Sequence, residues 1–318
     1  MRVELSIIIV NWNGGELLGR CVESVVSAPP SLEFEVVVVD NASGDGSVDA
    51  MRAGPGASAL EAAGRLRVFL NEDNKGFGQA NNQAFGLTDA PLLFLLNPDT
   101  EVTPGSIDRL LETLRADSRN GAAGPRLVNT DGSLQASVWR NPPTALSILL
   151  SASGAWRLLP KRVRGEFLLG HHWEHDRRRR VSMLGGAAVL VRREVIDEVG
   201  GFDARFHMYG EDNEWCLRMV RAGWHLVFEP GAVVLHHGGR SSAKRWDSTE
   251  KLRVQLEAAF FFQRHSLSKR RLVANLLAGY LASSFQSACR RVTGRRLEEV
   301  EVSAEVQRRQ LKEALRRG

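Results

Sequence analysis

The stretch Leu5–Val10 reads LSIIIV, and the polar run Asn11-Trp12-Asn13 ends it. A short, continuous run of apolar and β-branched residues is typical of a strand that is buried on both faces, as in a parallel sheet. Phe34–Val39 (FEVVVV) has the same character and ends at Asp40. Residues 16–27, between the two runs, carry apolar side chains at helical spacing. We therefore expect a strand, a helix and a second buried strand.

The alternation continues along the chain. Residues 67–70 and 92–96 have the composition of further strands, and residues 76–85 that of a helix between them, after a short helix over 48–53. Strands alternating with helices predict an open, mostly parallel, Rossmann-like α/β sheet flanked by helices. Ligands of such sheets bind beyond the carboxyl ends of the strands. Those ends carry the polar segments Asn11–Asn13, Asp40–Ser43 and Asn97–Asp99.

The second half of the chain predicts fewer regular elements. We expect a helix over 104–117, with Thr103 as its cap and Pro104 at its first position. A helix at about 193–199 and another from Gly210 to Arg221 come next. Two strands follow, at 224–228 and 232–236. After residue 241 the chain is expected to be helical to its end.

The distribution of charge along the chain also changes at about residue 241. Residues 241–318 hold 17 Lys and Arg against 8 Asp and Glu, a net charge of +9, whereas residues 1–240 carry −4. We expect an α/β domain over 1–241 and a basic, largely helical extension over 242–318. A basic extension favours an acidic partner surface, either anionic lipid or nucleic acid.

The apolar segments and the cysteines limit the class of protein. The run Leu5–Val10 is about half of the ~20 apolar residues that a spanning helix needs, so neither a spanning segment nor a signal peptide is expected. Cys21, Cys216 and Cys289 are widely spaced and form no zinc or disulfide pattern. They are expected to be small buried side chains in a reducing compartment.

Several polar residues at the strand ends have both a structural and a chemical interpretation. Asp40 suits either an Asx-turn or a contact to a nucleobase or ribose. Asp99, in the turn Asn97-Pro98-Asp99, suits either that turn or a hard divalent cation held together with substrate phosphates. Arg177–Arg180 is either a solvated loop or a phosphate-binding run.

Two later motifs have the same ambiguity. Glu211 and Asp212 fall where a helix begins, so they suit either the helix dipole or a general base that takes the proton of an acceptor hydroxyl. His236, followed by His237 and two glycines, is either structural or a metal ligand.

Taken together, these motifs resemble family 2 glycosyltransferases, and most closely their rhamnosyltransferase-like branch, which builds bacterial cell-surface polysaccharides. The resemblance covers about residues 5–241. It rests on the order of eight motifs: Ser6–Asn13 (SIIIVNWN), Val39–Ser47 (VDNASGDGS), Asn74–Asn82 (NKGFGQANN), Leu96–Asp99 (LNPD), Gly185–Ala187 (GGA), Gly200–Asp203 (GGFD), Tyr209–Asp212 (YGED) and His236–Ser241 (HHGGRS).

The resemblance implies a GT-A fold, transfer with inversion, and a role for each matching residue. By position, Val10, Trp12, Asp40 and Asn82 match nucleotide-contacting sites of the family. Asp99 matches the last residue of the metal-binding DxD motif, in which this chain has Asn97 instead of the first aspartate.

Asp212 matches the catalytic base, with Glu211 as a neighbour that raises its pKa or holds the acceptor. His236, rather than His237, matches a histidine that helps to bind the metal or the diphosphate. The implied cofactor is Mg²⁺ or Mn²⁺.

The resemblance also implies the partners. They are a dTDP- or UDP-linked sugar donor and a saccharide or lipid-linked saccharide acceptor. The basic C-terminal extension suggests a further partner, an anionic membrane surface at the inner face of the cell membrane. In the C-terminal extension, apolar residues recur at helical spacing between basic ends: Leu272, Val273, Leu276, Leu277, Tyr280, Leu281, Phe285 and Cys289. Such a helix lies on a membrane, packs on the catalytic domain or forms a dimer seam.

Two other classes of protein compete with the transferase. A nucleotidyltransferase shares the fold class, but the glycine- and lysine-rich phosphate loop expected after the first strand is missing. A non-catalytic binding protein would use the basic extension, but the sequence has no helix-turn-helix, zinc-finger or RNA-binding aromatic motif, so no nucleic acid is expected. The sequence leaves the oligomeric state open.

Overall fold

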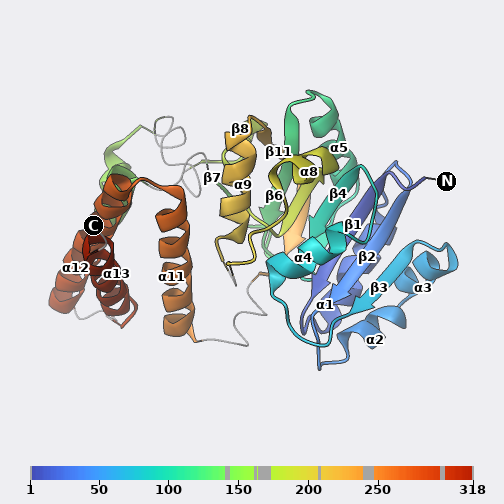
Figure 1. Cartoon of the computed structure of the whole chain (residues 1–318), viewed down its shortest axis with the longest axis horizontal. Helices are drawn as coiled ribbons and strands as arrows, with labels where there is room; N and C mark the ends of the chain where they lie inside the picture. Colours follow the sequence, from blue (N-terminus) through green and yellow to red (C-terminus); the bar gives the residue numbers. More distant parts are fainter. Residues whose placement is uncertain are drawn as a thin grey trace. The chain divides into compact units, whose positions relative to one another are not determined.

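The computed structural model describes residues 2–139, 144–160, 163, 173–206, 209–238, 247–293 and 298–316 (Figure 1). Contacts divide the chain into two compact units. The sheet unit comprises residues 1–140, 174–207 and 211–241, and the helical unit comprises 141–173, 208–210 and 242–318. Because residues 141–173 group with the C-terminal helices, the division by contacts is not a single cut at residue 241. The domain limits 1–241 and 242–318 stay a prediction.

Within the described residues, nine strands form one mixed, mostly parallel sheet. Its order is β3-β2-β1-β4-β10-β6-β11-β5, and β8 pairs with β11. The strands are β1 (Leu5–Asn11), β2 (Phe34–Asp40), β3 (Leu66–Leu70), β4 (Leu92–Leu96), β5 (Thr100–Val102), β6 (Asn120–Val128), β8 (Arg179–Val181), β10 (Ala188–Arg192) and β11 (His225–His236). A separate pair joins β7 (Val138–Trp139) to β9 (Met183–Leu184).

The register of the first strands brings the polar strand ends to one edge of the sheet. β1 runs parallel to β2 with Asn11 opposite Asp40, and parallel to β4 with Ile9 opposite Leu96. β10 runs antiparallel to β4 and places Ala188 opposite Leu96. The start of β10 therefore lies at the edge where β1, β2 and β4 end.

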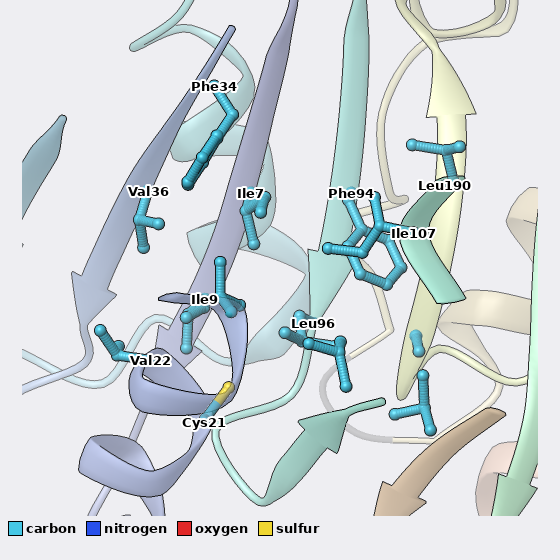
Figure 2. Packing of buried hydrophobic residues seen from close by; sticks show 14 of the residues in the cluster. Ile7, Ile9, Cys21, Val22, Phe34, Val36, Phe94, Leu96, Ile107 and Leu190 are labelled. Carbon is cyan, nitrogen blue, oxygen red and sulfur yellow. The ribbon is translucent and has the colours of Figure 1, made fainter. Parts of the chain in front are cut away.

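Burial explains why these strands form. Every residue of β1 and β2 is buried, as expected of strands covered on both faces. Alternate residues of β1 point to opposite faces, so Ile7 and Ile9 share one core with Phe34, Phe94 and helix α1 (Glu16–Ser27) (Figure 2). Helix α4 (Phe77–Phe85) packs on β1 and β2.

The helices of the sheet unit connect or follow these strands. They are α1 (Glu16–Ser27), α2 (Ser47–Arg52), α3 (Pro55–Ala62), α4 (Phe77–Phe85), α5 (Ser106–Arg115), α8 (Arg193–Val199) and α9 (Glu211–Arg221). Helix α3 was not predicted.

The predicted start of α5 was wrong. Its N-cap is Gly105, at φ +74°, and Thr103 does not cap it. The hydroxyl of Thr103 instead donates to the carbonyl of Val233 in β11, because the preceding residues pair with that strand as β5. The two strands predicted at 224–228 and 232–236 are one strand, β11, with an irregular register between Glu229 and Val233.

The helical unit contains α6 (Ala145–Ser153), the 3₁₀ turn Ala155–Leu158, α11 (Ser248–Ser266), α12 (Lys269–Thr293) and α13 (Glu298–Arg316). α12 packs against α6 and α13, and α11 packs against α13. Phe260, Leu272, Leu276 and Ala314 form its buried cluster. No helix in the described part of the chain is both long and apolar enough to cross a membrane.

The apolar residues of α12 do not form the single face that their spacing suggested. Leu272 and Leu276 are buried within the helical unit, with Phe260 of α11 and Ala314 of α13. Leu277, Leu281 and Phe285 are instead 44%, 51% and 61% exposed. Together with the exposed Ala274 and Ala288 they form one apolar stripe, which we call the α12 stripe. The side chain of Cys289 lies outside the described residues.

Candidate active site

The ends of β1 and β2 are joined by a polar cluster around Asp40. The Asp40 carboxylate, 4% exposed, accepts hydrogen bonds from Asn11 Nδ2 (2.7 Å), Ser43 Oγ (2.6 Å) and the Ser43 backbone N–H (2.9 Å). Asn11 also donates to Ser47 Oγ (2.9 Å). Asp40 therefore stabilises the turn that follows β2, through the backbone N–H three residues on. The neighbouring residues Val10 (buried) and Trp12 (half-buried) lie at the same edge.

The turn after β4 is tied to the loop before β10. The backbone N–H of Asn97 donates to the carbonyl of Ala187 (2.9 Å), and Thr100 donates to the carbonyl of Asn97 through its N–H (3.2 Å) and its hydroxyl (2.6 Å). These bonds fix the path of the Asn97-Pro98-Asp99 turn. They also set the loop Gly185–Ala187 beside that turn.

The same loop holds Asp212. Oδ2 of Asp212 accepts the backbone N–H of Gly186 (3.1 Å), and Oδ1 accepts that of Asn213 (2.8 Å). Asn97 and Asp212 thus bond to adjacent residues of one loop, although they lie far apart in sequence. The structure brings the LNPD and GED motifs together, as the sequence interpretation required.

Burial sets the protonation of the two carboxyl groups that begin α9. Burial, followed by the charge of Asp212, raises the pKa of Glu211 from 4.5 to about 8. Oε2 of Glu211 is buried without a hydrogen-bond partner among the described residues. Burial also raises the pKa of Asp212, against the hydrogen bonds from Gly186 and Asn213, which favour the ionised form. The pair therefore suits one ionised carboxylate, at Asp212, beside a protonated Glu211.

Asp99 and His236 meet because β5 pairs with the end of β11. Thr100 lies opposite His236 in that ladder, and the His237 N–H donates to the carbonyl of Asp99 (2.9 Å). Oδ1 of Asp99 then lies 3.3 Å from Nε2 of His236. Both side chains are largely buried.

This pair fits a divalent cation. Adjacent ligands of an octahedral cation with bonds of about 2.1 Å lie about 3 Å apart, close to the separation of the two atoms. Carboxylate oxygen and imidazole nitrogen are both common ligands. Within the described ranges, no group of three or more His, Cys, Asp or Glu side chains could hold a metal ion. Asp99 and His236 would supply two ligands, and phosphate or water oxygens would supply further ones.

A second pair beside it was not predicted. Nε2 of His237 lies 2.6 Å from Oε1 of Glu101, which also pairs with Arg20 (2.7 Å). Nδ1 of His236 lies 2.8 Å from Oε1 of Gln135. The adjacent histidines thus have different partners. His237 contacts Glu101, which forms an ion pair with Arg20, whereas His236 lies beside Asp99. The preference for His236 over His237 as the ligand rested on the resemblance and stays a prediction.

Asn82 has a structural partner. Its Nδ2 donates to the carbonyl of Phe202 (2.7 Å), and its Oδ1 accepts the N–H of the same residue (2.8 Å). Because both groups of the amide bond to one backbone, Asn82 fastens α4 to the GGFD motif. A Cβ on Gly201 would lie 2.1 Å from Asn82 Oδ1, so this position requires glycine.

The arginine run and two of the cysteines, also singled out in the sequence, form ion pairs or lie buried. In the arginine run, Arg178 pairs with Glu229 (2.5 Å) and Arg180 with Asp117 (3.2 Å). Cys21 and Cys216 are buried, and burial raises the pKa of both thiols to about 12. Residues 239–241 of the HHGGRS motif lie outside the described residues.

A cavity of about 770 Å³ lies along α1, beside Arg20, Glu23, Met51 and Glu101. None of the predicted site residues lines it. It contains the Arg20–Glu101 ion pair, so the charge of that arginine is already partnered.

Comparison with known proteins agrees with the sequence resemblance. The family model described as Glycosyl transferase family 2 matches residues 6–200, and that described as Glycosyl transferase family group 2 matches residues 163–289. The chain is 30% identical to the N-acetylglucosaminyl-diphospho-decaprenol L-rhamnosyltransferase of Mycobacterium tuberculosis over 93% of this chain and 98% of that protein. It is 28% identical to the O-antigen biosynthesis protein RfbC of Myxococcus xanthus, over 77% of this chain and 18% of that protein.

Two solved structures share the fold. The structure of GalNAc-T7 with UDP, GalNAc and Mn²⁺ matches 82% of this chain and half of that chain, with a TM-score of 0.54 and 20% identity. The mannosyltransferase PcManGT of Pyrobaculum calidifontis, in complex with GDP-Man and Mn²⁺, matches 99% of this chain and 86% of that chain, with a TM-score of 0.53 and 16% identity. The predicted GT-A fold, with its mostly parallel sheet, is confirmed.

Proposed function

Because the chain belongs to glycosyl transferase family 2 and is therefore a glycosyltransferase, we propose that it transfers rhamnose from a nucleotide diphospho-sugar to a lipid-linked saccharide. The family match favours this over the nucleotidyltransferase and non-catalytic binding alternatives. The observation that carries the proposal is the loop Gly185–Ala187, which bonds to Asp212 on one side and to Asn97 on the other.

Asp212 is the proposed general base. In the proposed step the acceptor hydroxyl gives its proton to the Asp212 carboxylate while its oxygen bonds to the anomeric carbon. The bond from that carbon to the diphosphate breaks on the opposite face. A single displacement of this kind inverts the anomeric configuration and needs no carboxylate nucleophile, unlike retaining hydrolysis. Two backbone N–H donors hold the Asp212 carboxylate in one orientation, which supports this role.

Glu211 is proposed to hold the acceptor. Its pKa of about 8 keeps it protonated at neutral pH, so it can donate a hydrogen bond. A protonated neighbour also spares Asp212 the repulsion of a second negative charge.

Asp99 and His236 are the residues proposed to hold Mg²⁺ or Mn²⁺ with the donor diphosphate. A cation there supplies positive charge against the negative charge that develops on the leaving nucleoside diphosphate. Asn97, which stands in the first position of the DxD motif, has no negative charge. Its role is proposed to be contact with the nucleotide-sugar.

The proposed nucleotide site is the edge formed by the ends of β1 and β2. Val10, Trp12 and Asp40 lie there, and Asn82 is proposed as a further contact from α4. A buried carboxylate such as Asp40 suits a ribose or base donor, but its hydrogen bonds to Asn11 and Ser43 also support a purely structural role.

The proposed donor is dTDP-rhamnose, with a UDP-sugar as the second candidate. The mycobacterial relative acts, by its name, on an acceptor that carries a diphospho-decaprenol group. A prenol chain resides in a membrane, so an enzyme for such an acceptor must work at its surface.

The helical unit is proposed to bind that surface, as a peripheral protein at the inner face of the membrane. The α12 stripe exposes three large apolar side chains, and α6, which packs on α12, exposes Leu146 and Leu149. Clusters of this kind are rare on monomers without a binding role. The exposed Arg271 precedes the stripe in a segment whose net charge is +9, which suits anionic headgroups.

The experiment that tests this function is a transfer assay with the full chain. It uses dTDP-rhamnose and a panel of UDP-sugars, with an N-acetylglucosaminyl-diphospho-polyprenol acceptor, and with Mn²⁺, Mg²⁺ or EDTA. We expect transfer from one donor, loss of transfer with EDTA, and inversion of the anomeric carbon by NMR. A product with retained configuration would contradict the proposed mechanism, and no consumption of any donor would contradict the proposed donor class.

A further inference from the structure

Gln135 lies just after the turn that follows β6, and its backbone N–H donates to the carbonyl of Leu127 in that strand. Its side chain contacts His236 at two points. Nε2 of Gln135 lies 2.7 Å from the carbonyl oxygen of His236, and Oε1 lies 2.8 Å from Nδ1 of the same residue.

The surrounding hydrogen bonds fix which way the Gln135 amide points. A backbone carbonyl only accepts hydrogen bonds, so the atom facing the His236 carbonyl must be the amide nitrogen. The same nitrogen donates to Oδ1 of Asn129 (2.6 Å). The atom that faces Nδ1 of His236 is therefore the amide oxygen, which carries no proton.

This orientation decides the tautomer of His236. Because Gln135 Oε1 only accepts, Nδ1 of His236 must carry the hydrogen between them. The neutral imidazole then has its lone pair on Nε2. That atom lies 3.3 Å from Oδ1 of Asp99. Two electron-rich atoms at this distance attract a cation.

The orientation of the amide is itself held by a chain of hydrogen bonds. Asn129 Nδ2 donates to Ser133 Oγ (2.8 Å), and Ser133 Oγ donates to Oδ1 of Asp131 (2.6 Å). Every bond runs in one direction, from His236 through Gln135, Asn129 and Ser133 to a carboxylate. The hydrogen bonds from Ser133 lower the pKa of Asp131, so this end of the chain stays ionised.

We propose that Gln135 is a positioning residue for the cation site, which holds His236 in the Nδ1–H tautomer and leaves Nε2 free to bind a divalent cation. This inference rests on the proposed function, because it takes Asp99 and His236 as the cation ligands. Metal-bound histidines commonly donate their other ring N–H to an acceptor of this kind.

The first test measures Mn²⁺ binding to the full chain by electron paramagnetic resonance, without donor or acceptor. Gln135→Leu keeps the approximate shape but accepts no hydrogen bond, and we expect it to weaken Mn²⁺ binding by about 10- to 100-fold. Gln135→Glu keeps an acceptor for Nδ1–H but loses the donor to the His236 carbonyl and to Asn129, so it should bind Mn²⁺ more tightly than Gln135→Leu and less tightly than the wild type. Gln79→Leu, on the exposed side of α4, is the matched control and should have no effect.

The second test observes the tautomer directly in the metal-free protein. In ¹⁵N-histidine-labelled protein, the His236 ring signals, assigned by their loss in His236→Asn, should show a protonated Nδ1. Gln135→Leu should shift the population toward protonated Nε2. Asn129→Ala, which removes the next bond of the chain, should give a smaller shift, and thermal melting would establish that each variant is folded.

The outcomes separate this inference from the proposed function. Equal tautomer populations in the wild type and Gln135→Leu, or Mn²⁺ binding as weak in Gln135→Glu as in Gln135→Leu, would overturn the role of Gln135. Absence of Mn²⁺ binding by the wild type would instead overturn the cation site, whatever the tautomer.

Discussion

The carboxylate of Asp212 accepts a hydrogen bond from the backbone N–H of Gly186 at 3.1 Å, so the first turn of α9 is fixed to the loop that precedes β10. A Cβ on Gly186 would lie 3.4 Å from that of Asp212 and 3.6 Å from the ring of Phe77. The carboxylate is therefore held beside a closely packed backbone, and its orientation is set before any substrate binds.

Asp212→Asn should abolish most transfer while leaving donor binding intact. An amide cannot take a proton from the acceptor, and general bases contribute typically 10²- to 10⁴-fold to the rate. We expect kcat to fall by at least about 100-fold, with the donor Kd, measured by calorimetry, within about twofold of the wild type. Asp49→Asn, in the exposed first turn of α2, is the matched control. Normal turnover by Asp212→Asn would exclude it as the base.

Glu211→Gln should change how stability depends on pH. The folded-state pKa of Glu211 is about 8, against an ordinary value of 4.5, so the folded protein binds more protons than the unfolded chain between these values. Its free energy of unfolding therefore falls as pH rises through this window. Glutamine does not ionise, so in the variant this residue no longer lowers the free energy of unfolding as pH rises.

The measurement is the difference in Tm between Glu211→Gln and the wild type. We expect it to be small near pH 5 and to grow by several degrees in favour of the variant by pH 8.5. Glu112→Gln, exposed on α5, should show no such trend. A difference in Tm that does not change with pH would mean that Glu211 titrates normally.

Asn82→Ala should lower stability, because it leaves the N–H and the carbonyl of Phe202 without their partner. Each buried polar group left unpaired costs about 1–3 kcal/mol. We expect the Tm to fall by several degrees in thermal melting. Gly201→Ala should have a similar effect, since its Cβ would displace the Asn82 amide.

The same variant separates the two roles of Asn82. If it contacts the nucleotide, Asn82→Ala also weakens donor binding at temperatures where the protein is fully folded. An unchanged Tm together with weaker donor binding would contradict the fastening role derived from the Phe202 contacts.

The strands that the sequence predicts most closely are those with continuous apolar runs. β1, β2 and β4 lie within one or two residues of their predicted limits, because burial on both faces requires apolar residues at every position. β6 was missed. Its sequence, NGAAGPRLV, has glycine and proline where a strand prefers branched residues, and its pairing with β10 and β11 determines its structure.

The candidate site could be predicted only in part, because only some of its residues belong to recognisable motifs. Asp99, Asp212 and His236 stand in motifs whose order is informative. Gln135 and Glu101 carry no such signal, because their role arises from which strands pair. Thr100 opposite His236 sets Glu101 near His237, and the turn after β6 sets Gln135 beside His236.

The α12 stripe should decide membrane binding. Leu281→Glu and Phe285→Glu together place two negative charges on its exposed apolar surface, which opposes insertion among anionic headgroups. We expect flotation of the full chain with phosphatidylglycerol-containing vesicles to fall at least about tenfold. Leu70→Glu, at an equally exposed leucine of β3, should float like the wild type. Unchanged flotation of the double variant would exclude the stripe as the membrane surface. A wild-type dimer in sedimentation that the double variant loses would identify the stripe as a dimer seam.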